Sequence, residues 1–137
     1  PQERSGMHGA GRGPRGGGFR GPGAAMGLRG IDLTDAQRDQ VRTITASHTT
    51  EFEQARTKLR DAHRALAEAA AAESIDEAAI RAKSGDVAAA MADEAILRAR
   101  VRAEVFGILT AEQLQKAKER RTAMQERMKE RRLRRNE

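Results

Sequence analysis

Glycine and proline, the residues that most disfavour helices, are confined almost entirely to the first thirty residues of this 137-residue chain. Eleven of the thirteen glycines and all three prolines lie there. Glycine loses the most entropy on ordering, and little in this stretch can be buried in return. We therefore expect residues 1–30 to be a disordered arm, followed by a helical domain over residues 31–132 and a frayed basic tail over residues 133–137.

Apolar and small residues recur at helical spacing in three stretches after the arm. The first predicts one unbroken amphipathic helix from Leu33 to about residue 72, with a seam of Val41, Ile44, His48, Phe52, Ala55, Leu59, Ala62, Leu66 and Ala69. The second stripe consists of Ile80, Val87, Met91, Leu97, Val101, Val105 and Ile108, with Gly85 as a weak point. The third helix, from Thr110 to about Arg132, carries Leu114, Ala117, Met124 and Met128.

Three capping boxes, S/T-x-x-E/Q, mark the helix starts at residues 34–37, 74–77 and 110–113. In such a box the hydroxyl accepts a backbone N–H that has no partner within the helix, and the residue three positions later reaches back. The short break at residues 73–74 predicts that the first helix folds back onto the second. The expected fold is all-α, a long antiparallel hairpin with an additional helix.

Two of these boxes are copies of one pentapeptide, L-T-x-x-Q, about 76 residues apart. Their shared residues are Leu33, Thr34 and Gln37 in the first copy, and Leu109, Thr110 and Gln113 in the second. With the Ala/Arg-rich helices and the glycine-rich arm, this pairing resembles the Spy/CpxP family of periplasmic chaperones and stress-response proteins. We interpret the motif as a helix cap and a family marker, and not as a catalytic site.

The resemblance implies a cradle-shaped homodimer in the periplasm, reached after a signal peptide has been removed. It implies ATP-independent binding of unfolding client proteins, or signalling of envelope stress through a sensor kinase. The low aromatic content of 2% also favours a dimer, because Ala-rich helices alone build a thin core.

Charge is distributed unevenly: residues 1–30 carry a net +4, residues 31–113 a net −4 and residues 114–137 a net +6. Basic rims around shallow apolar patches would attract acidic clients and hold them loosely. The candidate client-binding residues are Arg56, Arg60, Met91, Leu97, Arg98, Val101 and Arg102.

Two other functions stay open. One is metal sensing or storage by His48, His63, His8 and methionines across a dimer, since His48 and His63 lie about 22 Å apart on one helix and cannot share an ion within it. The other is nucleic-acid binding by the segment Arg15–Gly21 and the C-terminal arginines, which a single interleaved aromatic disfavours.

Catalysis is not expected, because the chain has no cysteine, no phosphate-binding loop, no H-E-x-x-H motif and no nucleophile elbow. For the same reasons no cofactor is expected. No stretch is long and apolar enough for a membrane span.

Overall fold

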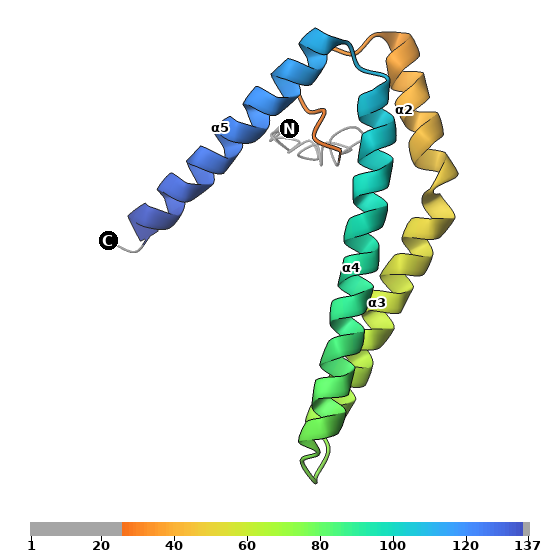
Figure 1. Ribbon diagram of the computed structural model, residues 1–137, viewed down its shortest axis with the longest axis vertical. Helices are drawn as coiled ribbons and strands as arrows, with labels where there is room; N and C mark the ends of the chain where they lie inside the picture. The colour runs from red at the N-terminus through yellow and green to blue at the C-terminus, as the bar shows by residue number, and fades with distance from the viewer. Residues whose placement is uncertain (1–25, 136–137) are drawn as a thin grey trace, which may run out of the picture.

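The computed structural model describes residues 26–135, which form four helices and no strand. They are α2 (Asp35–Ser47), α3 (Thr49–Ala70), α4 (Glu77–Gly107) and α5 (Ala111–Arg135). Helices α2 and α3 run down one side of a long hairpin, α4 returns beside them, and α5 slopes down and away from the upper end (Figure 1). The predicted all-α hairpin with an additional helix is confirmed.

The expected single helix from Leu33 to residue 72 is instead two helices, with a bend at His48 (Figure 1). Hydroxyl side chains before the bend donate to carbonyls of the preceding turn: Thr45 Oγ1 to Val41 O at 2.7 Å and Ser47 Oγ to Ile44 O at 2.7 Å. Such back-bonding competes with the helical ladder and bends helices. At His48 the backbone (φ −102°, ψ 6°) leaves helical geometry, and its N–H bonds Thr45 O at 3.3 Å.

The hairpin is held by the predicted seam of the first stretch, which faces α4. All nine residues of that seam are buried or half-buried. On α4 the buried stripe is partly different, because Ala90 is 1% exposed whereas Met91 is 55% exposed. The stripe steps through Val87, Ala90, Glu94, Leu97, Val101 and Val105. Met91 therefore belongs to the surface and not to the packing interface with α3.

Helix α4 begins two residues later than the sequence motif predicts. Its N-cap is Asp76, whose Oδ1 accepts the backbone N–H of Ala79 at 3.0 Å. The predicted capping box at Ser74 is therefore wrong. The carboxylate of Asp76 lies nearer the helix, caps it in place of Ser74 and also complements the helix dipole.

A small core closes the upper end of the hairpin around Leu28, Val41, Val105 and Leu109. Leu28 is 4% exposed and lies in the last part of the expected arm. Gly27 and Gly30 adopt positive φ values of 81° and 76°, which let the chain turn tightly on both sides of Leu28. The last residues of the expected arm, including Met26 and Leu28, are therefore packed, and residues 1–25 lie outside the described residues.

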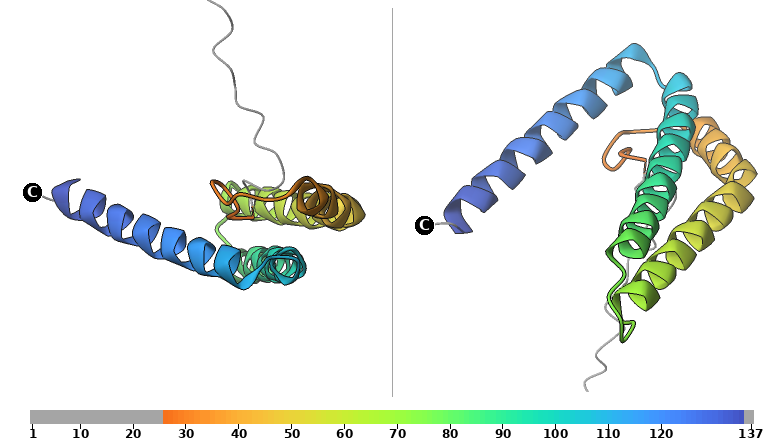
Figure 2. Two further views of the ribbon diagram at one scale, coloured as in Figure 1. Left: turned by 90° about the horizontal axis from the view of Figure 1, so that it is seen from above. Right: turned by 60° about the horizontal axis from the view of Figure 1, so that its bottom comes forward.

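Helix α5 barely contacts the other helices. Seen from above, it runs away from the layers formed by α2, α3 and α4 (Figure 2). It continues to Arg135, through the first three residues of the expected tail, while residues 136–137 lie outside the described part. None of the described helices has the length and hydropathy needed to cross a membrane.

Candidate functional site

Both L-T-x-x-Q motifs form complete capping boxes, as predicted. At the start of α2, Thr34 Oγ1 accepts from Gln37 N at 3.1 Å, and Thr34 N donates to Gln37 Oε1 at 3.0 Å. At the start of α5, Thr110 Oγ1 accepts from Gln113 N at 3.2 Å, and Thr110 N donates to Gln113 Oε1 at 2.9 Å. Each motif thus satisfies backbone groups that the helix end leaves without partners.

The two glutamines also bind each other, which joins the two motifs into one structure. Gln37 Nε2 donates to Gln113 Oε1 at 2.8 Å, and Gln113 Nε2 donates to Gln37 Oε1 at 2.9 Å. The remaining amide protons bind the carbonyls of the residues just before the opposite motif: Gln37 Nε2 donates to Ile108 O at 3.1 Å and Gln113 Nε2 to Asp32 O at 2.8 Å. We call Gln37 and Gln113 the glutamine pair.

Every hydrogen-bonding position of the glutamine pair is used. A primary amide has two donor hydrogens and two acceptor sites. The Nε2 of each glutamine donates to the Oε1 of the other glutamine and to a backbone carbonyl beside the other motif. The Oε1 of each glutamine accepts from the Nε2 of the other glutamine and from the threonine N–H of its own motif. Gln37 is 8% exposed. The arrangement fixes the start of α5 against the start of α2 and leaves no free group for chemistry on a ligand.

The predicted client-binding residues do not share one surface. Leu97 is 8% exposed and Val101 is fully buried, so both belong to the hairpin seam. Met91, Arg98, Arg56 and Arg60 are exposed, on α4 and α3. Arg102 is half-buried, with its guanidinium 4.6 Å from the centre of the Phe106 ring.

The surface of α4 opposite its buried stripe is also apolar. Its exposed residues, which we call the α4 outer face, are Ala88, Met91, Ala92, Ala95, Ile96, Ala99 and Ala103. At the helical spacing of 100° per residue, Arg98 borders this face beside Met91, Arg100 borders it beside Ile96, and Arg102 lies within it, between Met91 and Ala95. The face is flat because five of its seven members are alanine.

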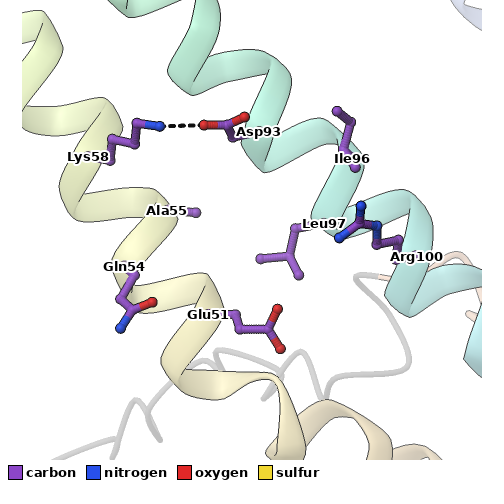
Figure 3. A pocket seen from close by; sticks show the side chains of 8 residues that line it. All are labelled: Glu51, Gln54, Ala55, Lys58, Asp93, Ile96, Leu97 and Arg100. Carbon is purple, nitrogen blue, oxygen red and sulfur yellow. Dashed lines mark hydrogen bonds and ion pairs between the residues drawn. The ribbon is translucent and has the colours of Figure 1, made fainter.

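A shallow groove of about 330 Å³ lies between α3 and α4 beside the α4 outer face, and the two share Ile96. Leu97 and Ala55 point into it, and the ion pair between Lys58 and Asp93, 2.5 Å long, crosses one end (Figure 3). Glu51, Gln54 and Arg100 complete the lining. Apolar residues at the base and charged residues at the rim suit a polypeptide better than a small molecule held in an enclosed cavity.

His48 occupies the bend and connects three helices. Its Nδ1 lies 2.7 Å from Glu51 Oε1, and its Nε2 lies 3.1 Å from both carboxylate oxygens of Glu104. Hydrogen bonds to Glu104 and then to Glu51 raise the pKa of His48 above its ordinary value of 6.5. His63, the other candidate ligand, is exposed further along α3, and within residues 26–135 no three His, Asp or Glu side chains are grouped to hold a metal ion. Met7 and His8 lie outside the described residues.

Sequence reasoning missed the glutamine pair and the α4 outer face. The pair had a signal in the two identical motifs, but their contact depends on a fold that brings residues 76 apart together. The face had a clearer signal, because alanines recur at three- and four-residue steps on the side of α4 away from Val87 and Val101.

Comparison with known proteins gives one match. A family model described as heavy-metal resistance matches residues 6–116, about four fifths of the chain. The matched region contains both L-T-x-x-Q motifs and the whole hairpin, and it ends in the second turn of α5. No curated protein and no solved structure shows a significant match to the chain.

Proposed function

The chain belongs to the heavy-metal resistance family, and from that premise we propose that it is an envelope protein that holds unfolding proteins without ATP. The family lies in the same helical superfamily as the Spy/CpxP proteins, marked by the L-T-x-x-Q motif. On this proposal the protein is periplasmic, acts as a homodimer and has no catalytic activity. A sensor kinase would be its partner if it also reports envelope stress.

The observation that carries this proposal is that α4 is apolar on two opposite faces, of which α3 covers only one. An exposed apolar face on a helix marks an interaction surface, so the α4 outer face calls for a polypeptide partner. Alanine and methionine make contacts that depend little on the partner's sequence. The bordering arginines add electrostatic attraction for acidic segments, which speeds encounter.

The assay is suppression of aggregation of a chemically unfolded acidic protein, without ATP, at near-stoichiometric ratios. Met91→Ser with Ile96→Ser should weaken protection about tenfold, since it removes the two largest apolar side chains of the face. Ile75→Ser is the matched control, because Ile75 is equally apolar and 78% exposed but lies in the turn between α3 and α4. It should protect like the wild type.

Two outcomes would contradict the proposal. A well-folded wild-type protein that protects none of several clients does not act as a chaperone. If the double variant instead turns a dimer into a monomer, the α4 outer face is an interface between copies, and the client site proposed here is wrong. Circular dichroism should show unchanged helicity in all variants, because the substituted residues are exposed.

The family description also favours a second function, metal binding. His48 with Glu104 offers a nitrogen and two carboxylate oxygens at the hairpin surface, which would form half of a tetrahedral zinc site. A second chain would have to supply the other ligands. Calorimetric titration with zinc and copper tests it: stoichiometric binding tighter than micromolar, lost in His48→Gln, would favour metal binding over client holding.

A further inference from the structure

The described part of the chain concentrates its excess positive charge on α5. Acidic and basic residues balance within each of α2, α3 and α4, whereas α5 has ten Lys and Arg against four Glu. The loops of the hairpin add only Asp32, Glu73 and Asp76 against Arg29, a net −2 that cannot neutralise the +6 of α5, either in the same chain or in a second copy. Most of the positive charge of α5 therefore has no counterpart in the hairpin.

The charges of α5 are also sorted by face. From Ala117, three- and four-residue steps lead through Arg121, Met124, Met128, Arg131 and Arg135, which share one side of the helix. The opposite side holds all four of its acidic residues, Glu112, Glu119, Glu126 and Glu130. We call the first set, from Arg121 to Arg135, the basic stripe.

Nothing in the described chain covers the basic stripe. Every residue from Lys118 to Arg135 is exposed, and Met124 and Met128 are 65% and 66% exposed. Packing of α5 against the rest of the protein ends near Arg120, whose Nη1 donates to Arg29 O at 2.6 Å. The family match ends at Lys116, before the basic stripe begins.

We propose that the basic stripe binds the surface of an anionic lipid membrane. A polar helix with basic residues on both sides of a narrow apolar stripe lies in the plane of the headgroups, with the arginines on the phosphates and the apolar side chains inserted between lipids. Nucleic acid would use the arginines but would leave Met124 and Met128 in water. Glu119, Glu126 and Glu130 on the far side would face away from the lipid phosphates.

This binding is peripheral and reversible. The stripe contains only two methionines among arginines, so electrostatic attraction provides most of the affinity and salt weakens it. The hairpin, joined to α5 through the glutamine pair, is left free for its own partners. The inference goes beyond the proposed client-holding function and does not depend on it.

The test is cosedimentation of the full chain with vesicles of phosphatidylcholine alone or mixed with phosphatidylglycerol. Binding should need the anionic lipid and be reversed by salt. Arg121→Gln, Arg131→Gln and Arg135→Gln together should weaken binding about a hundredfold, since each basic residue at the surface contributes about fivefold. The matched control is Arg56→Gln with Arg60→Gln and Arg100→Gln, which lowers the net charge equally on the hairpin and should change affinity less than about threefold.

Met124→Ser with Met128→Ser should weaken vesicle binding severalfold and leave binding to polyglutamate and duplex DNA unchanged. The proposal is wrong if the chain binds neutral and anionic vesicles alike, if it binds neither, or if the two triple variants lose affinity equally. It is also wrong if polyglutamate or DNA binds more tightly than the anionic vesicles at matched charge. Suppression of client aggregation by the same variants, measured in parallel, reports separately on the proposed function.

Discussion

At the scale of single residues, the glutamine pair shows what a capping motif can do beyond its own helix. Thr34 and Thr110 cap with their hydroxyls, a role that many serines or aspartates could fill. Glutamine at the third position is more demanding, because its amide must donate twice and accept twice at once. A glutamate of the same length can only accept when ionised, so it could not replace either glutamine without leaving a carbonyl unpaired.

The effects of Gln37→Ala and Gln113→Ala on stability should therefore be strongly coupled. Each single substitution should lower the free energy of unfolding by about 1–3 kcal/mol, because it leaves the remaining amide without its partner. The double substitution should cost about 1–2 kcal/mol less than the sum of the singles, since neither amide is then left unpaired. Urea unfolding of the four proteins measures this coupling. Additive losses would show that the two amides do not bind each other in solution.

His48 predicts a pH dependence of stability. Its pKa is raised in the folded protein by Glu104 and Glu51, so the protonated form binds these carboxylates better than it does in the unfolded chain. The resulting stabilisation is fully present below the ordinary histidine pKa of about 6.5 and is lost as pH rises through the raised value. The denaturation midpoint should therefore decrease as the pH rises from about 6.5 through the raised pKa of His48, and His48→Gln should make the midpoint less dependent on pH. If the midpoint of His48→Gln decreases as much as that of the wild type, other titrating groups cause the pH dependence.

At the scale of elements, helix packing could be predicted from the sequence wherever a single apolar stripe determines which face of the helix is buried. The seam of α3 was predicted residue by residue because each member is apolar or small and, from Phe52 to Ala62, its neighbours in the sequence are polar. On α4 the same reasoning chose Met91 over Ala90, since alanine is so frequent there that its periodicity does not single out one face. The bend at His48 was missed because hydroxyl back-bonds do not alter the apolar pattern.

Gly85 in helix α4 is a position where a substitution should stabilise the protein. A Cβ built on Gly85 meets no atom within 4 Å, and its φ is not positive. Gly85→Ala should therefore raise the free energy of unfolding by about 0.5–1 kcal/mol, through the lower entropy of the unfolded chain and the better helix propensity of alanine. Thermal melting checks this. A lower melting temperature would mean that a flexible or closely packed backbone is required at this point of the hairpin.

At the scale of the whole molecule, the described part of the chain has little interior. Its buried apolar residues are Leu28, Ile31, Val41, Val87, Ala90, Leu97, Val101, Val105, Leu109 and Ala117. Helix α3 has no buried residue at all. Two helices side by side can bury only one stripe each, so a stable fold of this length gains much from a second layer.

A second copy of the chain supplies that layer in the homodimer that we predict at micromolar concentration. Sedimentation equilibrium should give twice the 15.0 kDa of the chain. Because dissociation would expose apolar surface of both copies, dilution should lower the melting temperature as well as the mass. Arg121→Gln with Arg131→Gln should leave the dimer intact, since both residues lie on the exposed part of α5, away from the packed hairpin. A monomeric mass at high micromolar concentration, with full helicity and a melting temperature independent of concentration, would show that the single hairpin is sufficient and that the dimer prediction is wrong.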